Sequence, residues 1–191
     1  MPEALEIGRQ SGIGVDFSHY RTGPGTQGQV AERMELIDQA KSEGVDCTME
    51  LYPYPSGCTF ALSMLPSHIH IGGPEQALAR IKDSTEQNKL VETLNSEGWV
   101  HESVVTYSPE TPENEGMGLV DLAGINSTSP GQIVCDLLIK NDLKVAFRGA
   151  PPDSVAIWRQ LSQDTMDFLS RPAYMVGSAA IPVGNKPHPR A

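Results

Sequence analysis

A histidine stands where the first predicted strand of this sequence ends. The run GIGVDFSH reads as a short apolar strand from Gly14 to Ser18, with His19 directly after it. An imidazole in that place can ligate a metal ion or transfer a proton. The same place also suits a histidine with a purely structural role, and its position alone does not decide between these readings.

A second pair of histidines has the spacing of a metal motif but not its setting. His68 and His70 form an HxH pair in PSHIHIGG. On a strand, residues two apart share one face, and many hydrolases hold zinc this way. Here no apolar strand leads into the pair, and Pro66 precedes it. We therefore predict that the pair lies in a loop and binds no metal.

Two more segments could contact a small molecule. The prolines of YPYP stiffen the chain after a predicted strand, so Tyr52 is held in a defined direction, unless the segment is simply a packed aromatic turn. At the other end of the sequence, Arg190 could clamp a carboxylate, or be a solvated terminal charge. The turn before it carries Ala179 and Ala180, and no acid or nucleophile with an obvious partner.

The elements around these residues alternate in type. The first sixty residues read as helix, strand, helix and strand, with the helices at residues 3–10 and 29–43. This alternation is typical of parallel βα units. Right-handed connections place the carboxyl ends of such strands at one edge of the sheet. We therefore expect His19 and Tyr52 at the same edge, where α/β folds bind ligands.

The middle of the chain has a different character, and we read residues 66–150 as an inserted subdomain between residues 1–65 and residues 151–191. Its predicted elements are a charged helical stretch (75–95), a strand containing His101 (99–107), a solvated acidic loop (110–115), a helix capped by Ser129 (128–141) and a strand (143–149). The last part returns to a helix (153–170) and a strand, AYMVGS. The expected fold class is therefore α/β.

Composition excludes several classes of function. The 191 residues suit one domain or a large fragment of one, and 24 acidic against 14 basic residues give a net charge of −10. That charge argues against nucleic-acid and anionic-membrane partners, which need a basic surface. No apolar run is long enough to span a bilayer, and MPEALEIGRQ lacks the features of a signal peptide. The three widely spaced cysteines (Cys47, Cys58 and Cys135) indicate reduced thiols in a cytoplasmic protein.

Three segments, in this order, carry a family resemblance: GIGVDFSHYRTG, VDCTMELYPYPSGCTFALSMLP and YMVGSAAIPVGNKPHPRA. Together they resemble the N-acyl-D-amino-acid deacylases, the D-aminoacylase branch of the amidohydrolase superfamily. That family shows a strand ending in Ser-His, a strand running into Tyr-Pro-Tyr, and a Gly-Ser-Asp turn followed by Pro-x-Pro-Arg. The resemblance covers nearly the whole chain. It implies a partial TIM barrel of about strands six to eight, with an α+β insertion between the last two.

The resemblance also implies a reaction and roles for individual residues. The family hydrolyses the N-acyl amide of N-acyl-D-amino acids with a water activated by zinc at the carboxyl-terminal mouth of the barrel. His19 would be a zinc ligand, and Tyr52 would contact the substrate or the tetrahedral intermediate. Arg21 and Arg190 would hold the substrate carboxylate. The HIH run would fall inside the insertion, in agreement with its exclusion as the metal motif.

Two departures from the family pattern bear on activity. Ala179 stands where the family carries the aspartate that moves the proton from water to the leaving nitrogen, and alanine can neither ligate a metal nor accept a proton. The family's HxH, its bridging ligand and its strand-five histidine would lie upstream of Met1, and its small β-sandwich has no counterpart. The sequence therefore predicts a zinc site that is incomplete and a chain that is impaired alone.

An alternative from another class stays open: a non-catalytic remnant that binds a small carboxylate or a partner chain. A partial barrel leaves strand edges and apolar helix faces exposed. Such a chain is expected to self-associate or to pair with a complementary barrel fragment.

Overall fold

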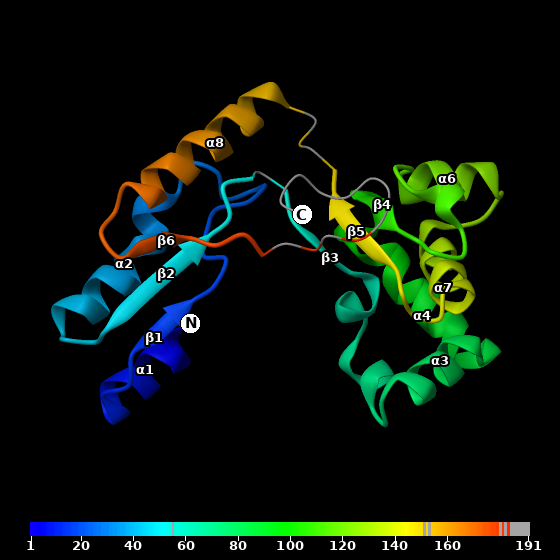
Figure 1. Ribbon diagram of the computed structural model, residues 1–191, viewed down its shortest axis with the longest axis horizontal. Helices are drawn as coiled ribbons and strands as arrows, with labels where there is room; N and C mark the ends of the chain where they lie inside the picture. The colour runs from blue at the N-terminus through cyan, green and yellow to red at the C-terminus, as the bar shows by residue number, and fades with distance from the viewer. Residues whose placement is uncertain (55, 151, 153, 180, 182, 184–191) are drawn as a thin grey trace. The chain divides into compact units, whose positions relative to one another are not determined.

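The computed structural model describes residues 1–54, 56–150, 152, 154–179, 181 and 183. The chain forms two compact units of mixed α/β structure (Figure 1). Unit 1 takes residues 1–55 and 151–179, and unit 2 takes residues 56–150 and 180–191. Among the described residues, no helix combines the length and the apolar character needed to cross a membrane.

Unit 1 is built on a parallel sheet with the strand order β1-β2-β6. Its elements are α1 (Pro2–Ser11), β1 (Val15–Phe17), α2 (Val30–Ser42), β2 (Cys47–Leu51), α8 (Val155–Leu169) and β6 (Tyr174–Val176). Strand β2 pairs with both neighbours. The register with β1 begins at Val15 opposite Cys47, and the register with β6 begins at Tyr174 opposite Met49. The prediction of parallel βα units is thus confirmed, including the third strand in AYMVGS.

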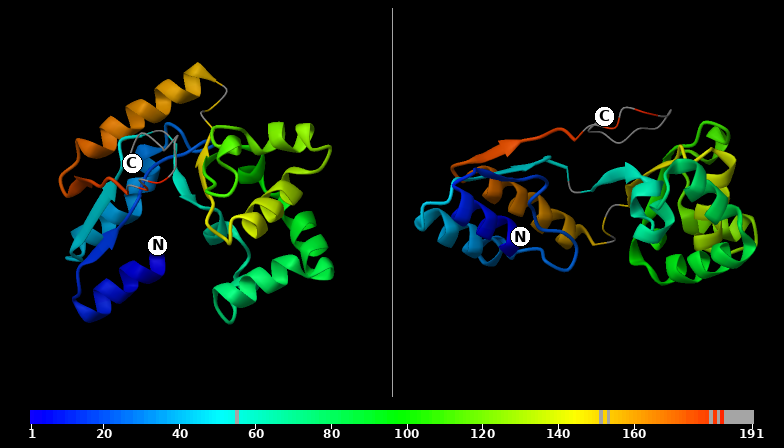
Figure 2. Two further views of the ribbon diagram at one scale, coloured as in Figure 1. Left: turned by 45° about the vertical axis from the view of Figure 1, so that its right-hand side comes forward. Right: turned by 90° about the horizontal axis from the view of Figure 1, so that it is seen from below.

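All three helices of unit 1 cover the same face of this sheet, as the right-hand view of Figure 2 shows. The alternation of CTMEL explains why: Cys47, Met49 and Leu51 are buried against Ile37 and Phe168 of the helices. The opposite face carries the polar residues of β1 and β2 (Asp16, Thr48 and Glu50), and we call it the polar face. Strand β6 adds the exposed Met175 to this face, as the register partner of Glu50. Unit 1 is therefore a two-layer structure with helices on one side of its sheet and a mainly polar face on the other.

A buried carboxylate fixes the long loop between β1 and α2. Asp164 of α8 is 1% exposed and accepts hydrogen bonds from Thr22 Oγ1 and Gly28 N, both at 2.7 Å, and from Gln160 Nε2 at 2.8 Å. Burial raises the pKa of this carboxyl, but the three hydrogen bonds outweigh burial and lower its pKa below the ordinary value of 3.8. Asp164 is therefore ionised at neutral pH and ties the loop to the helix.

Unit 2 has an antiparallel sheet of order β3-β5-β4 with helices around its own core. Its elements are β3 (Cys58–Phe60), η1 (Ala61–Met64), η2 (Ser67–His70), α3 (Pro74–Lys82), α4 (Ser84–Ser96), α5 (Gly98–His101), β4 (Ser103–Tyr107), η3 (Pro112–Asn114), α6 (Leu119–Ile125), α7 (Pro130–Lys140) and β5 (Ala146–Gly149). Gly149 N donates to Gly57 O at 2.9 Å, so the two ends of the segment 57–149 lie side by side.

The structure places residues 56–65 in unit 2, whereas the sequence reading grouped them with the first βα units. Strand β3 pairs with β5, and Ala61 and Leu65 are buried in the core of unit 2. In the sequence, this segment directly follows the strand that ends in Tyr52. Its antiparallel partner, β5, lies almost ninety residues further along the chain, so no local pattern of residues indicates the pairing. The pairing of Cys58 with Arg148 is what assigns the segment to unit 2.

Other local readings of the middle segment need correction. The helical stretch 75–95 is two helices, because Asp83 ends α3 and its side chain caps α4 by accepting from Thr85 N and Glu86 N at 3.0 Å. His101 lies at the end of α5 and not in a strand. The acidic loop is not wholly solvated, since Glu115 is 3% exposed and accepts a hydrogen bond from Ser108 N. The predicted cap Ser129 is confirmed: its Oγ accepts from Gln132 N.

The three cysteines are free thiols, and all are buried. Burial raises the pKa of the Cys47 thiol, and it raises the pKa of Cys135 to about 12. Because the thiolate is the reactive form, we expect neither thiol to react with a disulfide reagent such as dithiobis-nitrobenzoate in the native protein. Both should react at once in denaturant. Rapid modification of Cys135 in the native chain, located by peptide mass mapping, would contradict this.

Candidate active site at the strand ends of unit 1

The carboxyl ends of β1 and β2 bring two of the predicted site residues into contact. The His19 and Tyr52 rings lie 5.0 Å apart, centre to centre, and meet edge to face at 70°. They come from connections that follow neighbouring parallel strands, so the prediction that they emerge at one edge of the sheet is confirmed. Tyr52 is 6% exposed, whereas the His19 side chain is 46% exposed. A solute can therefore reach His19 more readily than Tyr52.

Arg21 joins the same cluster from the loop after β1. Its guanidinium carbon lies 4.3 Å from the centre of the Tyr52 ring, which is a cation–π contact. Its Nη1 also donates to the carbonyl oxygen of Tyr54. These contacts hold the guanidinium beside the Tyr-Pro-Tyr segment. A planar cation fixed in this way suits recognition of a carboxylate.

Glu50 is a member of the site that the sequence reading missed. Its Oε1 accepts a hydrogen bond from Ser18 Oγ at 2.5 Å and lies 3.5 Å from His19 Nε2. The signal was present in the alternation of the strand, since Thr48 and Glu50 are the two polar residues of CTMEL and share one face. A carboxylate on that face, two residues before the predicted site tyrosine, points to the strand end.

The turn after β6 completes this edge of the sheet. Gly177 N donates to Leu51 O at 3.0 Å, which continues the pairing with β2 beyond Val176. Ala179 has a φ of 44°, in the left-handed region that aspartate and asparagine adopt several-fold more often than other non-glycine residues. The backbone at this position therefore suits an aspartate better than the alanine that occupies it. Arg190 and the neighbouring His188 lie outside the described residues.

The described residues do not make a zinc site on their own. Within the part of the chain that the structure covers, there is no group of three or more His, Cys, Asp or Glu side chains that could hold a metal. His19 and Glu50 are two donors, while protein zinc sites use at least three. In unit 2, His68 and His70 lie on the short helix η2, and His70 Nε2 lies 3.3 Å from Leu65 O, so the structure gives no support to a metal role for this pair.

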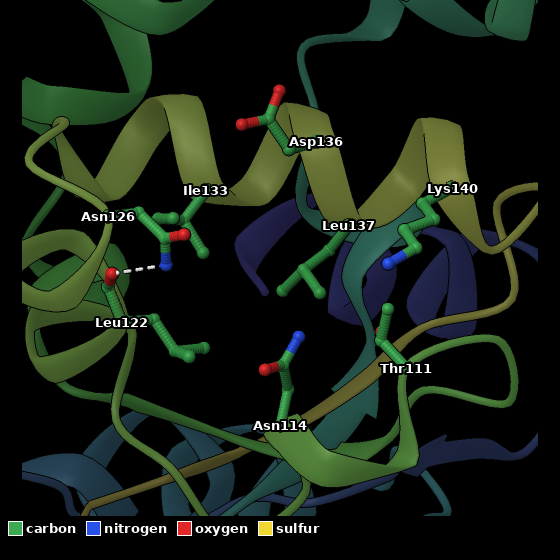
Figure 3. A pocket seen from close by; sticks show the side chains of 8 residues that line it. All are labelled: Thr111, Asn114, Leu122, Asn126, Ile133, Asp136, Leu137 and Lys140. Carbon is green, nitrogen blue, oxygen red and sulfur yellow. Dashed lines mark hydrogen bonds between the residues drawn. The ribbon is translucent and has the colours of Figure 1, made fainter.

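Unit 2 carries a separate hollow, shown in Figure 3. Its volume is about 160 Å³, and its lining combines apolar side chains of α6 and α7 with polar ones: Thr111, Asn114, Leu122, Asn126, Ile133, Asp136, Leu137 and Lys140. None of the residues predicted from the sequence to act in catalysis or binding contributes to it. The chemistry expected from the sequence therefore concerns unit 1.

A parallel α/β sheet whose strand ends gather His19, Tyr52 and Arg21 is the arrangement expected of a deacylase of the amidohydrolase type, and comparison with known proteins confirms the resemblance. No family model matches the chain. The curated N-acyl-D-glutamate deacylase of Alcaligenes xylosoxydans xylosoxydans is 24% identical over 189 residues, which make up 98% of this chain and 30% of the relative.

Solved structures show the same fold over the same share of their length. The N-acyl-D-glutamate deacylase of Bordetella bronchiseptica, solved with zinc and a phosphonate mimic of the tetrahedral intermediate, is 23% identical with a TM-score of 0.65. It is matched over 99% of this chain and 31% of its own. A D-aminoacylase described as defining a novel subset of amidohydrolases gives 21% identity and a TM-score of 0.63, with the same coverage. The chain thus spans about 30% of the length of these relatives.

Proposed function

We propose that this chain supplies strands six to eight of a TIM-barrel hydrolase that cleaves the N-acyl amide of N-acyl-D-amino acids, with N-acyl-D-glutamate as the first substrate to test. The observation that carries the proposal is the cluster of His19, Tyr52 and Arg21 at the ends of parallel strands. The similarity to N-acyl-D-glutamate deacylase over 98% of the chain supports it. Unit 2 is then the insertion between the last two barrel strands.

In this proposal, each site residue has a separate task. Arg21, held against the Tyr52 ring, binds the carboxylate of the acyl-amino acid, and Arg190 is its second contact. Tyr52 packs against the substrate or stabilises the tetrahedral intermediate. His19 would contribute one ligand to a zinc ion like the one bound in the Bordetella relative, and other parts of a complete barrel would supply the remaining ligands.

We further propose that the 191 residues by themselves do not catalyse. His19 and Glu50 alone do not form a zinc site, and Ala179 provides no group to move a proton. The isolated chain is therefore expected to bind zinc at less than one equivalent and to release no amino acid from N-acetyl-D-glutamate. Metal analysis and an amine-release assay measure both quantities.

A chimera tests the hydrolase proposal directly. This chain replaces the matching 189-residue region of the curated N-acyl-D-glutamate deacylase, with either Ala179 or aspartate at that position. We expect both chimeras to fold and bind zinc, and only the aspartate form to hydrolyse N-acetyl-D-glutamate. Two folded, zinc-loaded and inactive chimeras would overturn the hydrolase proposal. Equal activity of the two would overturn the assignment of Ala179.

The second candidate function is binding of a small carboxylate without turnover, alone or in an assembly with another chain. Ala179 favours it, because a site that keeps Arg21 and Tyr52 but lacks the proton-transferring group can still bind a carboxylate.

An NMR titration of the isolated chain with N-acetyl-D-glutamate tests this function. The ligand should shift the signals of residues 19–21, and Arg21→Ala should abolish the shift. Arg171→Ala, which removes a surface ion pair with Asp38, is the matched control. A compact monomer in sedimentation would contradict assembly with another copy.

A further inference from the structure

The Glu50 carboxylate is held in place from two sides. Ser18 Oγ donates to its Oε1 at 2.5 Å. On the other side lies Gly177, where a Cβ atom would stand only 1.3 Å from Glu50 Oε2. Any other residue at position 177 would therefore displace the carboxylate. The Glu50 side chain is 19% exposed, so its position is set by protein contacts more than by water.

The backbone at His19 is held in an uncommon conformation by the same strand. His19 has a φ of 58°, in the left-handed region that few non-glycine residues adopt, although histidine adopts it more often than most. Tyr20 N, directly after it, donates to Glu50 O at 3.0 Å. Backbone conformations of this kind persist where the surrounding structure imposes them, and they gather at functional sites. Glu50 thus contacts the His19 segment with both its main chain and its side chain.

The His19 imidazole lies between two groups that limit its orientation. Its Nε2 is 3.5 Å from Glu50 Oε1, and its ring meets the Tyr52 ring edge to face. Carboxylates commonly orient functional histidines in this manner.

We propose that Glu50 is a positioning residue whose carboxylate, together with the Tyr52 ring, holds the His19 imidazole in one orientation. Gly177 takes part by leaving the space that the carboxylate occupies. The value of this orientation for hydrolysis rests on the function proposed above. The orientation itself is a property of the isolated chain and is measurable without substrate or turnover.

The test measures how rigidly the His19 ring is held, by NMR relaxation of its ring C–H bonds in the isolated chain. Glu50→Ala should lower the ring order parameter by about 0.2 or more, which is the difference between a rigid backbone (about 0.85) and a flexible one (below about 0.6). Gly177→Ala should do the same without altering Glu50. Glu50→Gln, which keeps an acceptor oxygen, should leave the order parameter of the His19 ring at its wild-type value. Signals are assigned with His19→Gln.

Asp16→Ala is the matched control, because Asp16 accepts a hydrogen bond from Thr48 on the same polar face at 2.7 Å. It should leave the His19 ring unchanged. A purely structural role of Glu50 would instead loosen the backbone of Val15–Phe17 together with the ring, and would not be rescued by glutamine. A ring that is mobile in the wild type, or that stays rigid in both Glu50→Ala and Gly177→Ala, would overturn the proposal.

Discussion

In the chimera with N-acyl-D-glutamate deacylase, Ala179→Asp should raise the rate of N-acetyl-D-glutamate hydrolysis by about 10²- to 10⁴-fold, which is the usual contribution of a positioned general acid and base. Alanine offers no atom that can take a proton from water or return it to the leaving nitrogen. The change should appear mainly in kcat, because it adds a group used in the transition state and not in substrate binding. Initial rates over a range of substrate concentrations separate the two constants.

The backbone favours this substitution and also supplies its control. Ala179 already has a φ of 44°, which aspartate tolerates well, so the new side chain needs no rearrangement of the turn. Ser178→Asp places a carboxylate one residue earlier in the same turn. We expect it to leave the rate within a few-fold of the starting value. A rise of similar size from Ser178→Asp would show that charge alone, and not the position of the acid, is responsible.

Asp164→Ala should lower the free energy of unfolding of unit 1 by about 2–4 kcal/mol. The substitution leaves Thr22 Oγ1 and Gly28 N, both on the loop after β1, without the acceptor that they share, and unpaired buried donors are costly. Urea unfolding followed by the fluorescence of Trp158, in the same helix, measures the loss. Asp167→Ala is the control, because Asp167 makes the same i,i+4 bond with Gln163 but is exposed. It should cost less than about 0.5 kcal/mol.

Asp164 also gives unit 1 a defined response to acid. Its pKa is lower in the folded state than its ordinary value of 3.8, so its contribution is complete at neutral pH. That contribution is lost as the pH falls below about 3.8 toward the folded-state pKa, because the unfolded chain then binds the proton more readily. The difference in stability between wild type and Asp164→Asn should therefore shrink with acidification. A difference that stays constant from pH 7 to pH 3 would contradict this.

The sequence predicted unit 1 well because its signals are local. The spacing of apolar residues predicted α2, and the alternation of helices and strands predicted parallel pairing. The rule for parallel connections predicted that His19 and Tyr52 share one edge of the sheet, and the structure brings them into contact there. Unit 2 was harder to predict, since β3 finds its partner β5 almost ninety residues away. The buried position of Glu115 was equally hidden, because a run of acidic residues reads as solvated unless the hydrogen bond from Ser108 is known.

The contacts between side chains that are distant in the sequence could not be predicted, either within the site or in the loop beside it. The strand alternation put Glu50 on the polar face, but its approach to His19 depends on the space left by Gly177, which lies 127 positions further along the chain. Asp164 is a similar case, since its partners Thr22 and Gly28 are more than 130 positions away. Both carboxylates are fixed by tertiary packing that a pattern of residue types does not record.

The bond between Gly149 N and Gly57 O has a consequence for how such a chain changes in evolution. A segment of more than ninety residues leaves unit 1 and returns to it through two strands whose ends are adjacent, and it brings its own hydrophobic core. It is therefore a module that recombination can lengthen, shorten or replace through a short splice, while β2 and β6 keep their register. We therefore expect sequence and length to vary more in this module than in the three parallel strands when further relatives are compared.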